Sequence, residues 1–177
     1  KETYEYHDGF ADLNKVKSIK IYKKGETIQH YSKPEIRTSI KYSIAPNVSI
    51  KASYNSIQQY IFMLSNTIAI SPNDQWKLVS SQITPPLVDQ LALGWYQNLF
   101  KNRIEANVEF YRKWINNTVE YKDGADFLSP YPIETQLLQG EQNVKGVEFM
   151  IKKKGGKLTG WLAYTYSRSY MKVDSDN

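Results

Sequence analysis

The sequence predicts an all-β fold, an antiparallel up-and-down meander of long strands, and three observations predict it. Apolar and polar side chains alternate with a period of two along several segments. Short turn signals recur at a nearly constant spacing, and two long polar segments lie between them. Such a pattern is typical of a sheet whose two faces meet different surroundings.

The alternation is strongest in three segments, residues 36–44, 48–55 and 103–110. In these segments twelve of the thirteen positions on one face are apolar, whereas none of the twelve positions on the other face is. Because the chain is 41% hydrophobic, about five of those twelve would be apolar by chance. An amphipathic helix would need apolar residues at positions i, i+3 and i+4, which these segments lack. They are therefore predicted to be strands.

Weaker copies of the alternation predict further strands at residues 91–96, 147–152 and 158–167. The first part of the chain differs, because residues 1–33 alternate poorly and predict only a loop or an irregular strand. The predicted organisation is therefore a poorly defined region over residues 1–33, followed by regular strands over residues 34–177.

Short turns are predicted near residues 46–47, 101–102 and 155–156, where Pro, Gly and Asn concentrate. Between successive turns the chain must run out along one strand and return along another. The two crossings are long loops, residues 65–86 and 122–142, which taken together are rich in Pro, Gly, Asn, Asp and Ser. Loops of about 20 residues are uncommon inside compact domains. Outer-membrane β-barrels, in contrast, join their strands by short periplasmic turns and by long loops outside the cell.

The predicted strands are also long enough to cross a membrane. Residues 103–121 could form one continuous strand, and the hydrocarbon core requires about 9–11 tilted residues. Because lipid offers no hydrogen-bond partners, a spanning sheet must close on itself. We therefore expect a segment of a transmembrane β-barrel in the bacterial outer membrane, with apolar side chains toward lipid and polar side chains toward the lumen. Interfacial aromatic girdles are expected at Tyr54, Trp95, Trp114 and Tyr164.

The competing interpretation is a soluble β-sandwich, a secreted or surface module that binds carbohydrate. The strands of a sandwich would also alternate, but they are usually shorter, and their turns recur about every 8–12 residues. In this chain the short turns start 55 and 54 residues apart. The long strands and long loops favour the barrel.

Composition excludes several classes of function. Lys and Arg number 23 against 18 Asp and Glu, a net charge of +5, without the clustered basic face that a nucleic-acid partner requires. The chain has no Cys and only two histidines, His7 and His30, so we expect no metal centre, no cofactor and no Ser-His-Asp triad. The protein is therefore not expected to be an enzyme.

The two ends of the chain indicate a segment of a larger protein. It begins at Lys1 without a visible signal peptide, and it finishes in Val173 followed by the polar residues 174–177. No apolar run approaches the ~20 residues of a membrane helix.

Several short motifs resemble those of the TonB-dependent receptors of Bacteroidetes-type bacteria, and they occur in the same order as in that family. They cover about residues 34–169 and comprise Pro-Glu-Ile-Arg at 34–37, Lys-Ala-Ser-Tyr-Asn at 51–55, Ser-Pro-Asn-Asp-Gln-Trp at 71–76, Ile-Thr-Pro-Pro at 83–86, Glu-Tyr-Lys-Asp-Gly-Ala at 120–125, Gly-Val-Glu-Phe at 146–149 and the aromatic-rich run at 158–167.

This resemblance implies a 22-stranded barrel that is closed by an N-terminal plug domain and imports a nutrient with energy delivered by TonB. The chain would hold six or seven strands from the later part of the barrel, without the plug and without the box that binds TonB. The implied partners are outer-membrane lipid, TonB, the plug and an unidentified nutrient. Whether a surface lipoprotein covers the barrel stays open.

Candidate ligand-binding residues lie on the predicted outer loops, where a nutrient would first be met: Asp74, Trp76, Tyr121 and Asp123. Aromatic and carboxylate side chains there could stack on sugars or bind polar groups, but the more frequent role of such side chains is to hold the loops against their neighbours.

The glutamates of residues 103–121 have a simpler explanation than catalysis. Glu105 and Glu109 would lie about 13 Å apart on one strand face, too far for a glycosidase pair. We expect them to face the lumen and to pair with Arg103, Lys113 or the plug.

Overall fold

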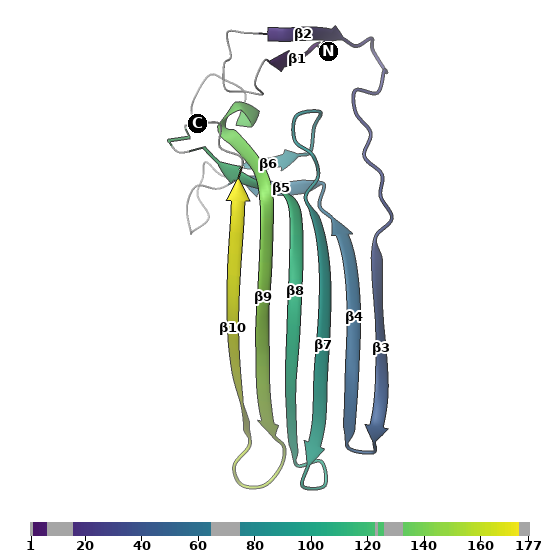
Figure 1. The fold of residues 1–177 in the computed structure, drawn as a ribbon, viewed down its shortest axis with the longest axis vertical. Coiled ribbons are helices and arrows are strands. Elements are labelled where there is room, and N and C mark those ends of the chain that lie inside the picture. The colour runs from purple at the N-terminus through teal and green to yellow at the C-terminus, as the bar shows by residue number, and fades with distance from the viewer. Residues whose placement is uncertain (1, 7–15, 65–74, 123, 126–132, 174–177) are drawn as a thin grey trace.

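The computed structural model describes residues 2–6, 16–64, 75–122, 124–125 and 133–173, and it is built almost entirely of antiparallel strands (Figure 1). Six long strands form one sheet in the order β10-β9-β8-β7-β4-β3, and two short hairpins, β1-β2 and β5-β6, form separate sheets. The strands are β1 Glu2–Tyr6, β2 Val16–Ile21, β3 Ile36–Ala45, β4 Val48–Gln58, β5 Ile61–Leu64, β6 Gln75–Leu78, β7 Leu87–Leu99, β8 Ile104–Tyr121, β9 Leu137–Lys153 and β10 Gly160–Val173. The predicted all-β, antiparallel meander is confirmed.

Short connections join the long strands at one end of the sheet, the lower end in Figure 1. Pro46 and Asn47 separate β3 from β4, residues 100–103 join β7 to β8, and residues 154–159 join β9 to β10. The second connection turns through three residues with positive φ, namely Phe100, Lys101 and Asn102, and the third through Gly155 and Gly156. Asparagine and glycine adopt this conformation most readily, which explains their concentration at these turns.

The opposite end carries the long excursions, and here the structure differs from the sequence prediction. Within the predicted loop 65–86, β6 pairs with β5, and within the predicted loop 122–142, β9 already begins at Leu137. The early start of β9 has a physical reason, because it pairs the outer end of β8 as far as Tyr121, whose backbone groups would otherwise lack partners. Residues 1–33 include the hairpin β1-β2.

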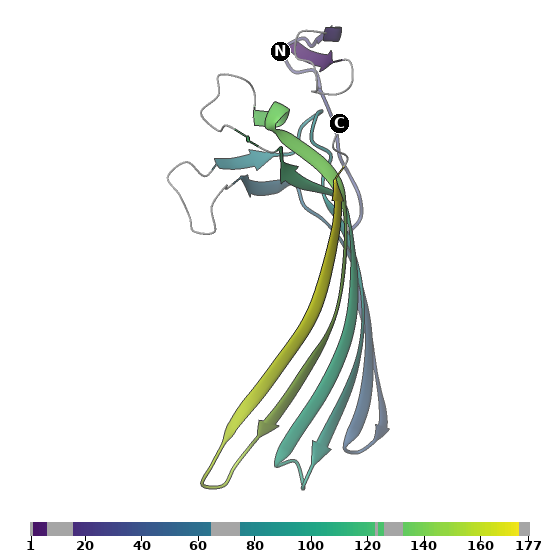
Figure 2. The same ribbon diagram turned by 60° about the vertical axis from the view of Figure 1, so that its left-hand side comes forward.

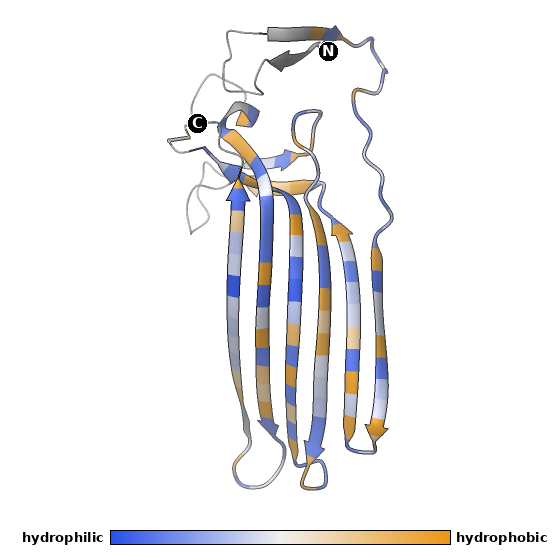
Figure 3. Cartoon of the chain, in the orientation of Figure 1, coloured by the Kyte–Doolittle hydropathy of each residue, from blue (hydrophilic) through white to orange (hydrophobic). Residues whose placement is uncertain are grey.

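The two faces of the six-stranded sheet have opposite character, which appears as alternating bands along each strand in Figure 3. On β7, Leu93 is 55% exposed, whereas the adjacent Ala92 is only 8% exposed. Ile40 on β3 is 74% exposed. Among the described residues no second sheet covers this apolar face, so the double-layered core of a β-sandwich is absent from this part of the chain. A single sheet that exposes its apolar face fits a barrel wall.

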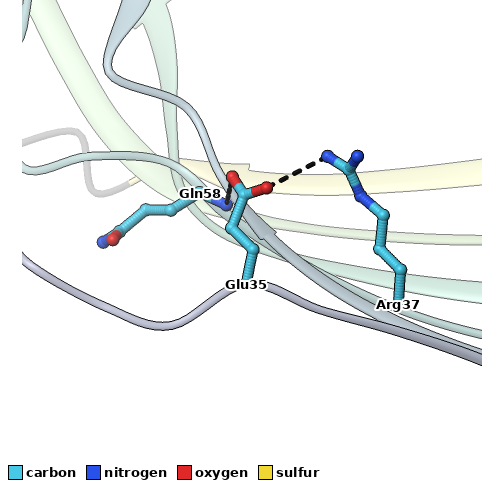
Figure 4. A network of polar contacts seen from close by, with 3 residues as sticks. All are labelled: Glu35, Arg37 and Gln58. Carbon is cyan, nitrogen blue, oxygen red and sulfur yellow. Dashed lines mark hydrogen bonds and ion pairs between the residues drawn. The ribbon is translucent and has the colours of Figure 1, made fainter.

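The sheet bends along its strands, and β5 and β6 project to one side of its upper end (Figure 2). Where β4 leaves the sheet, Glu35 accepts a hydrogen bond from the Gln58 backbone N–H at 3.4 Å and forms an ion pair with Arg37 at 3.0 Å (Figure 4). Both side chains of this ion pair are exposed, so it contributes little to stability. None of the helical residues that the structure describes forms a segment long and apolar enough to cross a membrane.

Candidate functional site

The outer end of β8 contains a β-bulge, which interrupts the regular pairing with β9. The pairing register with β9 shifts between Asn116 and Thr118, and the intervening Asn117 has a φ of 57°. Asparagine tolerates this left-handed conformation better than most residues. Its side-chain Nδ2 donates a hydrogen bond to the Pro85 carbonyl at 3.3 Å. The bulge therefore attaches the segment before β7 to the outer end of β8.

Gln139 on β9 strengthens the same attachment. Its Oε1 accepts a hydrogen bond from the Thr84 backbone N–H at 3.0 Å, and its Nε2 donates to the Thr84 carbonyl at 2.7 Å. The same Nε2 lies 3.1 Å from the Asn117 carbonyl. The Gln139 side-chain amide thus pairs with the Thr84 backbone as a neighbouring strand would. The next residue, Pro85, is fully buried.

A small apolar cluster lies beneath the excursions, and we call it the mouth core. Its buried members are Phe62, Leu64, Ile83 and Leu137, with Val79, Val119, Tyr121 and Ile133 packed against them. Phe62 and Leu64 come from one face of β5, as the period of two requires. Because the mouth core joins β5, β8 and β9, it fixes the hairpin β5-β6 to the end of the sheet.

The other face of the hairpin β5-β6 is apolar yet exposed, and we call it the hairpin face. Ile61 lies opposite Leu78, and Met63 lies opposite Trp76; all four side chains are exposed, Trp76 by 70%. From the opposite side of β6, Lys77 forms an ion pair of 2.6 Å with Glu134 in the short 3-10 helix η1, Ile133–Gln136. The hairpin is therefore anchored on one face and free on the other within the described part of the chain.

The four residues suggested as ligand contacts separate into different settings. Trp76 lies on the hairpin face, and its side chain is exposed to solvent. Tyr121 ends β8 opposite Leu137 and packs against the mouth core, so it supports the loops. Asp74 and Asp123 lie outside the described residues. Among these four, only Trp76 and Tyr121 can be placed, and the structure does not bring them into one pocket.

Charged side chains line the polar face of the sheet, the face that carries Ala92. Glu109 on β8 lies directly opposite Glu148 on β9. On its other side Glu109 lies opposite Gly94 on β7. The same register row continues through Lys51 on β4 to Lys41 on β3. A Cβ at Gly94 would lie only 2.7 Å from the Tyr96 ring, so glycine leaves room for that ring. The Tyr96 hydroxyl donates to Glu109 at 2.8 Å.

The expected partners of two glutamates were partly wrong. Glu105 forms an ion pair with Lys154 rather than with Arg103 or Lys113, and Glu109 accepts its hydrogen bond from Tyr96. Glu148 was not singled out from the sequence, although alternation places it on the polar face. Only the strand register shows that it opposes Glu109.

Comparison with known proteins agrees with this architecture. The profile of the family described as TonB dependent receptor-like, beta-barrel matches residues 4–177. No curated protein and no solved structure matches the chain. The family match covers nearly the whole chain, and the single sheet with an exposed apolar face, short turns at one end and excursions at the other has the form of a barrel wall. This chain therefore belongs to the β-barrel family of the TonB-dependent receptors, outer-membrane transporters of bacteria that take up nutrients.

Proposed function

We propose that the six-stranded sheet is one sector of the barrel wall of a Bacteroidetes-type importer, that its polar face contacts a plug domain, and that its outer end meets the nutrient. The motif resemblance over residues 34–169 supports the Bacteroidetes type. The observation that carries the proposal is the opposed pair Glu109 and Glu148 on the polar face.

Two carboxylates directly opposite each other on neighbouring strands repel one another and destabilise a sheet. Among the described residues neither glutamate has an ion-pair partner, and the only hydrogen bond that Glu109 accepts comes from the uncharged Tyr96 hydroxyl. A cationic group in the lumen would remove this repulsion. The plug domain is the part of such a receptor that fills the lumen, so we assign the missing positive charge to the plug.

Replacing both Glu109 and Glu148 with glutamine in the full-length receptor should loosen the plug without unfolding the barrel. The physical reason is that glutamine keeps the shape but cannot form the charge-assisted hydrogen bonds, each worth about 1.5–3 kcal/mol. Limited proteolysis of the plug measures the effect, and we expect cleavage to be faster by roughly tenfold or more.

Glu105→Gln is the matched control, because Glu105 is already paired with Lys154 inside the barrel wall. It should leave the cleavage rate of the plug near that of the unaltered receptor. Equal protection of the plug in the double variant and the control would refute the contact.

The hairpin face supports a second part of the proposal, namely that the outer end makes contact with the nutrient or with a surface lipoprotein over the mouth. Four exposed apolar side chains on one short hairpin are costly in water, and such patches mark binding surfaces. Trp76 is the largest of them, and tryptophan is enriched at energetically dominant contacts.

Trp76→Ala should lower receptor-dependent growth when a strain that relies on the full-length receptor is supplied with single nutrient sources. Loss of one aromatic contact worth about 1 kcal/mol corresponds to roughly a fivefold weaker interaction. Phe100→Ala is the control, because Phe100 is equally exposed but lies at the opposite end of the sheet. Identical growth of the two variants on every source would contradict a role for the hairpin face.

A further inference from the structure

Three cationic side chains form a row on the apolar face of the sheet, and we call them the cationic row. Arg112 on β8 lies directly opposite Lys145 on β9, and Lys145 lies directly opposite Arg168 on β10. All three are exposed. They share the face of Phe110, Val147 and Tyr166, which lie two residues nearer the short turns and form an apolar row.

Nothing in the described part of the chain neutralises the cationic row. Arg112 lies over the Trp114 ring at 4.8 Å and donates to the Asn143 side chain at 3.3 Å, but none of the three cations forms an ion pair there. Like charges directly opposite each other destabilise a sheet. The row therefore needs anions from outside the sheet.

Two carboxylates share this face of the sheet with the cationic row. Asp89 on β7 accepts a hydrogen bond from the Tyr54 hydroxyl at 2.8 Å. Glu141 lies opposite Lys172, four residues along β9 from Lys145. Neither lies in the same register row as the three cations.

The position along the strands places the cationic row at the outer edge of the membrane. From Ile104, the first residue of β8, to Arg112 is nine residues (104 to 112), and a tilted strand crosses the hydrocarbon core in about 9–11. The next row outward carries Trp114 and Tyr170, which are suited to the interfacial aromatic girdle. Since the short turns are periplasmic, this edge belongs to the outer leaflet.

An open, shallow apolar groove of about 520 Å³ lies over β3, β4, β7 and β8, and Arg112 on β8 is one of its lining residues. On the exposed face its lining includes Ile40, Ala52, Leu93 and Phe110. Ala52 is the smallest of these side chains and lies between Ile40 and Leu93 in the strand register. A groove of this kind fits an acyl chain, and its charged lining residue fits the head group of the same molecule.

We propose that the cationic row binds the phosphate groups of an anionic lipid of the outer leaflet, and that one acyl chain of this lipid occupies the groove. Arginine and lysine are the side chains that recognise phosphate, arginine through two parallel hydrogen bonds. Basic clusters at the membrane surface attract anionic head groups. This site lies on the opposite face of the barrel wall from the nutrient path, so it is independent of the imported cargo.

The test uses the full-length receptor in detergent and measures binding of fluorescent lipid A carrying two phosphates. Replacing Arg112, Lys145 and Arg168 together with glutamine should weaken binding by about tenfold or more. Replacing Lys41, Lys51 and Lys113 with glutamine is the matched control, because it removes the same charge from the polar face and should change binding less than about twofold. A closed barrel migrates differently on a gel before and after boiling in detergent, and loss of this difference would identify a misfolded variant. In that case the single variant Arg168→Gln, at the edge of the described sheet, takes the place of the triple variant and should weaken binding measurably.

Two further arms use the unaltered receptor and need no variant. Lipid A without phosphates should bind about tenfold more weakly, and millimolar inorganic phosphate should fail to displace phosphorylated lipid A. Equal binding of both lipids, equal loss in the triple variant and its control, or displacement by inorganic phosphate alone would each overturn the lipid assignment.

Discussion

Replacing Val108 with arginine is expected to destabilise the folded receptor by about 2–4 kcal/mol, the cost of a cation facing lipid near the middle of the bilayer. Val108 lies on the apolar face of β8, opposite Trp95 on β7 and Phe149 on β9, and Phe149 lies opposite Tyr164 on β10. Trp95 and Tyr164 therefore belong to this mid-membrane row, and not to the interfacial girdle in which the sequence placed them. Val108 is midway between Ile104 at the turn end and Arg112 in the cationic row, so an arginine there can reach neither membrane surface easily. Urea unfolding of the full-length receptor in phospholipid vesicles measures the loss.

Asn107→Arg is the control for Val108→Arg, because it introduces the same side chain one residue earlier, on the polar face. There the guanidinium meets the lumen, and we expect a change below about 1 kcal/mol. If the two substitutions cost the same, the assignment of the apolar face to lipid is wrong.

Leu64→Ala should destabilise the hairpin β5-β6 by about 2–5 kcal/mol, the usual cost of truncating a fully buried leucine. Leu64 is only 2% exposed and contributes to the mouth core together with Phe62, Ile83 and Leu137. The loss should be local, because the six long strands form a separate sheet. Hydrogen exchange should accelerate at the amides of β5 and β6 while the amides of β8 stay protected.

Met63→Ala controls for the shortening of a side chain on the same strand. Met63 is 40% exposed and lies on the hairpin face rather than in the mouth core. Its truncation should change exchange little, since it leaves no cavity. Acceleration throughout the long strands after Leu64→Ala would show that the mouth core supports the barrel wall itself.

Much of the fold could be predicted from the sequence because side-chain alternation is a local property. Ile40 and Leu93 were expected on an exposed apolar face, and both are exposed. Successive side chains of a strand point to opposite faces, of which one meets lipid and the other the lumen. Apolar and polar residues therefore alternate along the strand. The outer end was harder to predict, because Gln139 and Thr84 pair through a side-chain amide rather than through a repeating pattern.

The candidate site divides in the same way. Trp76 could be singled out as an aromatic residue in a polar segment, but only its pairing with Met63 shows that it belongs to an apolar face. Tyr121 had the same appearance in the sequence, yet it packs against the mouth core. Exposure and burial depend on what the rest of the chain covers, which composition does not record.

By itself, the sequence determined that this protein is a meander of long strands with one face for lipid and one for a polar interior. Only the tertiary structure decided which strands' residues stand side by side, including Glu109 beside Glu148 and the cationic row of Arg112, Lys145 and Arg168. The physical reason is that alternation specifies a face, whereas register depends on backbone hydrogen bonds between strands that are distant in the chain.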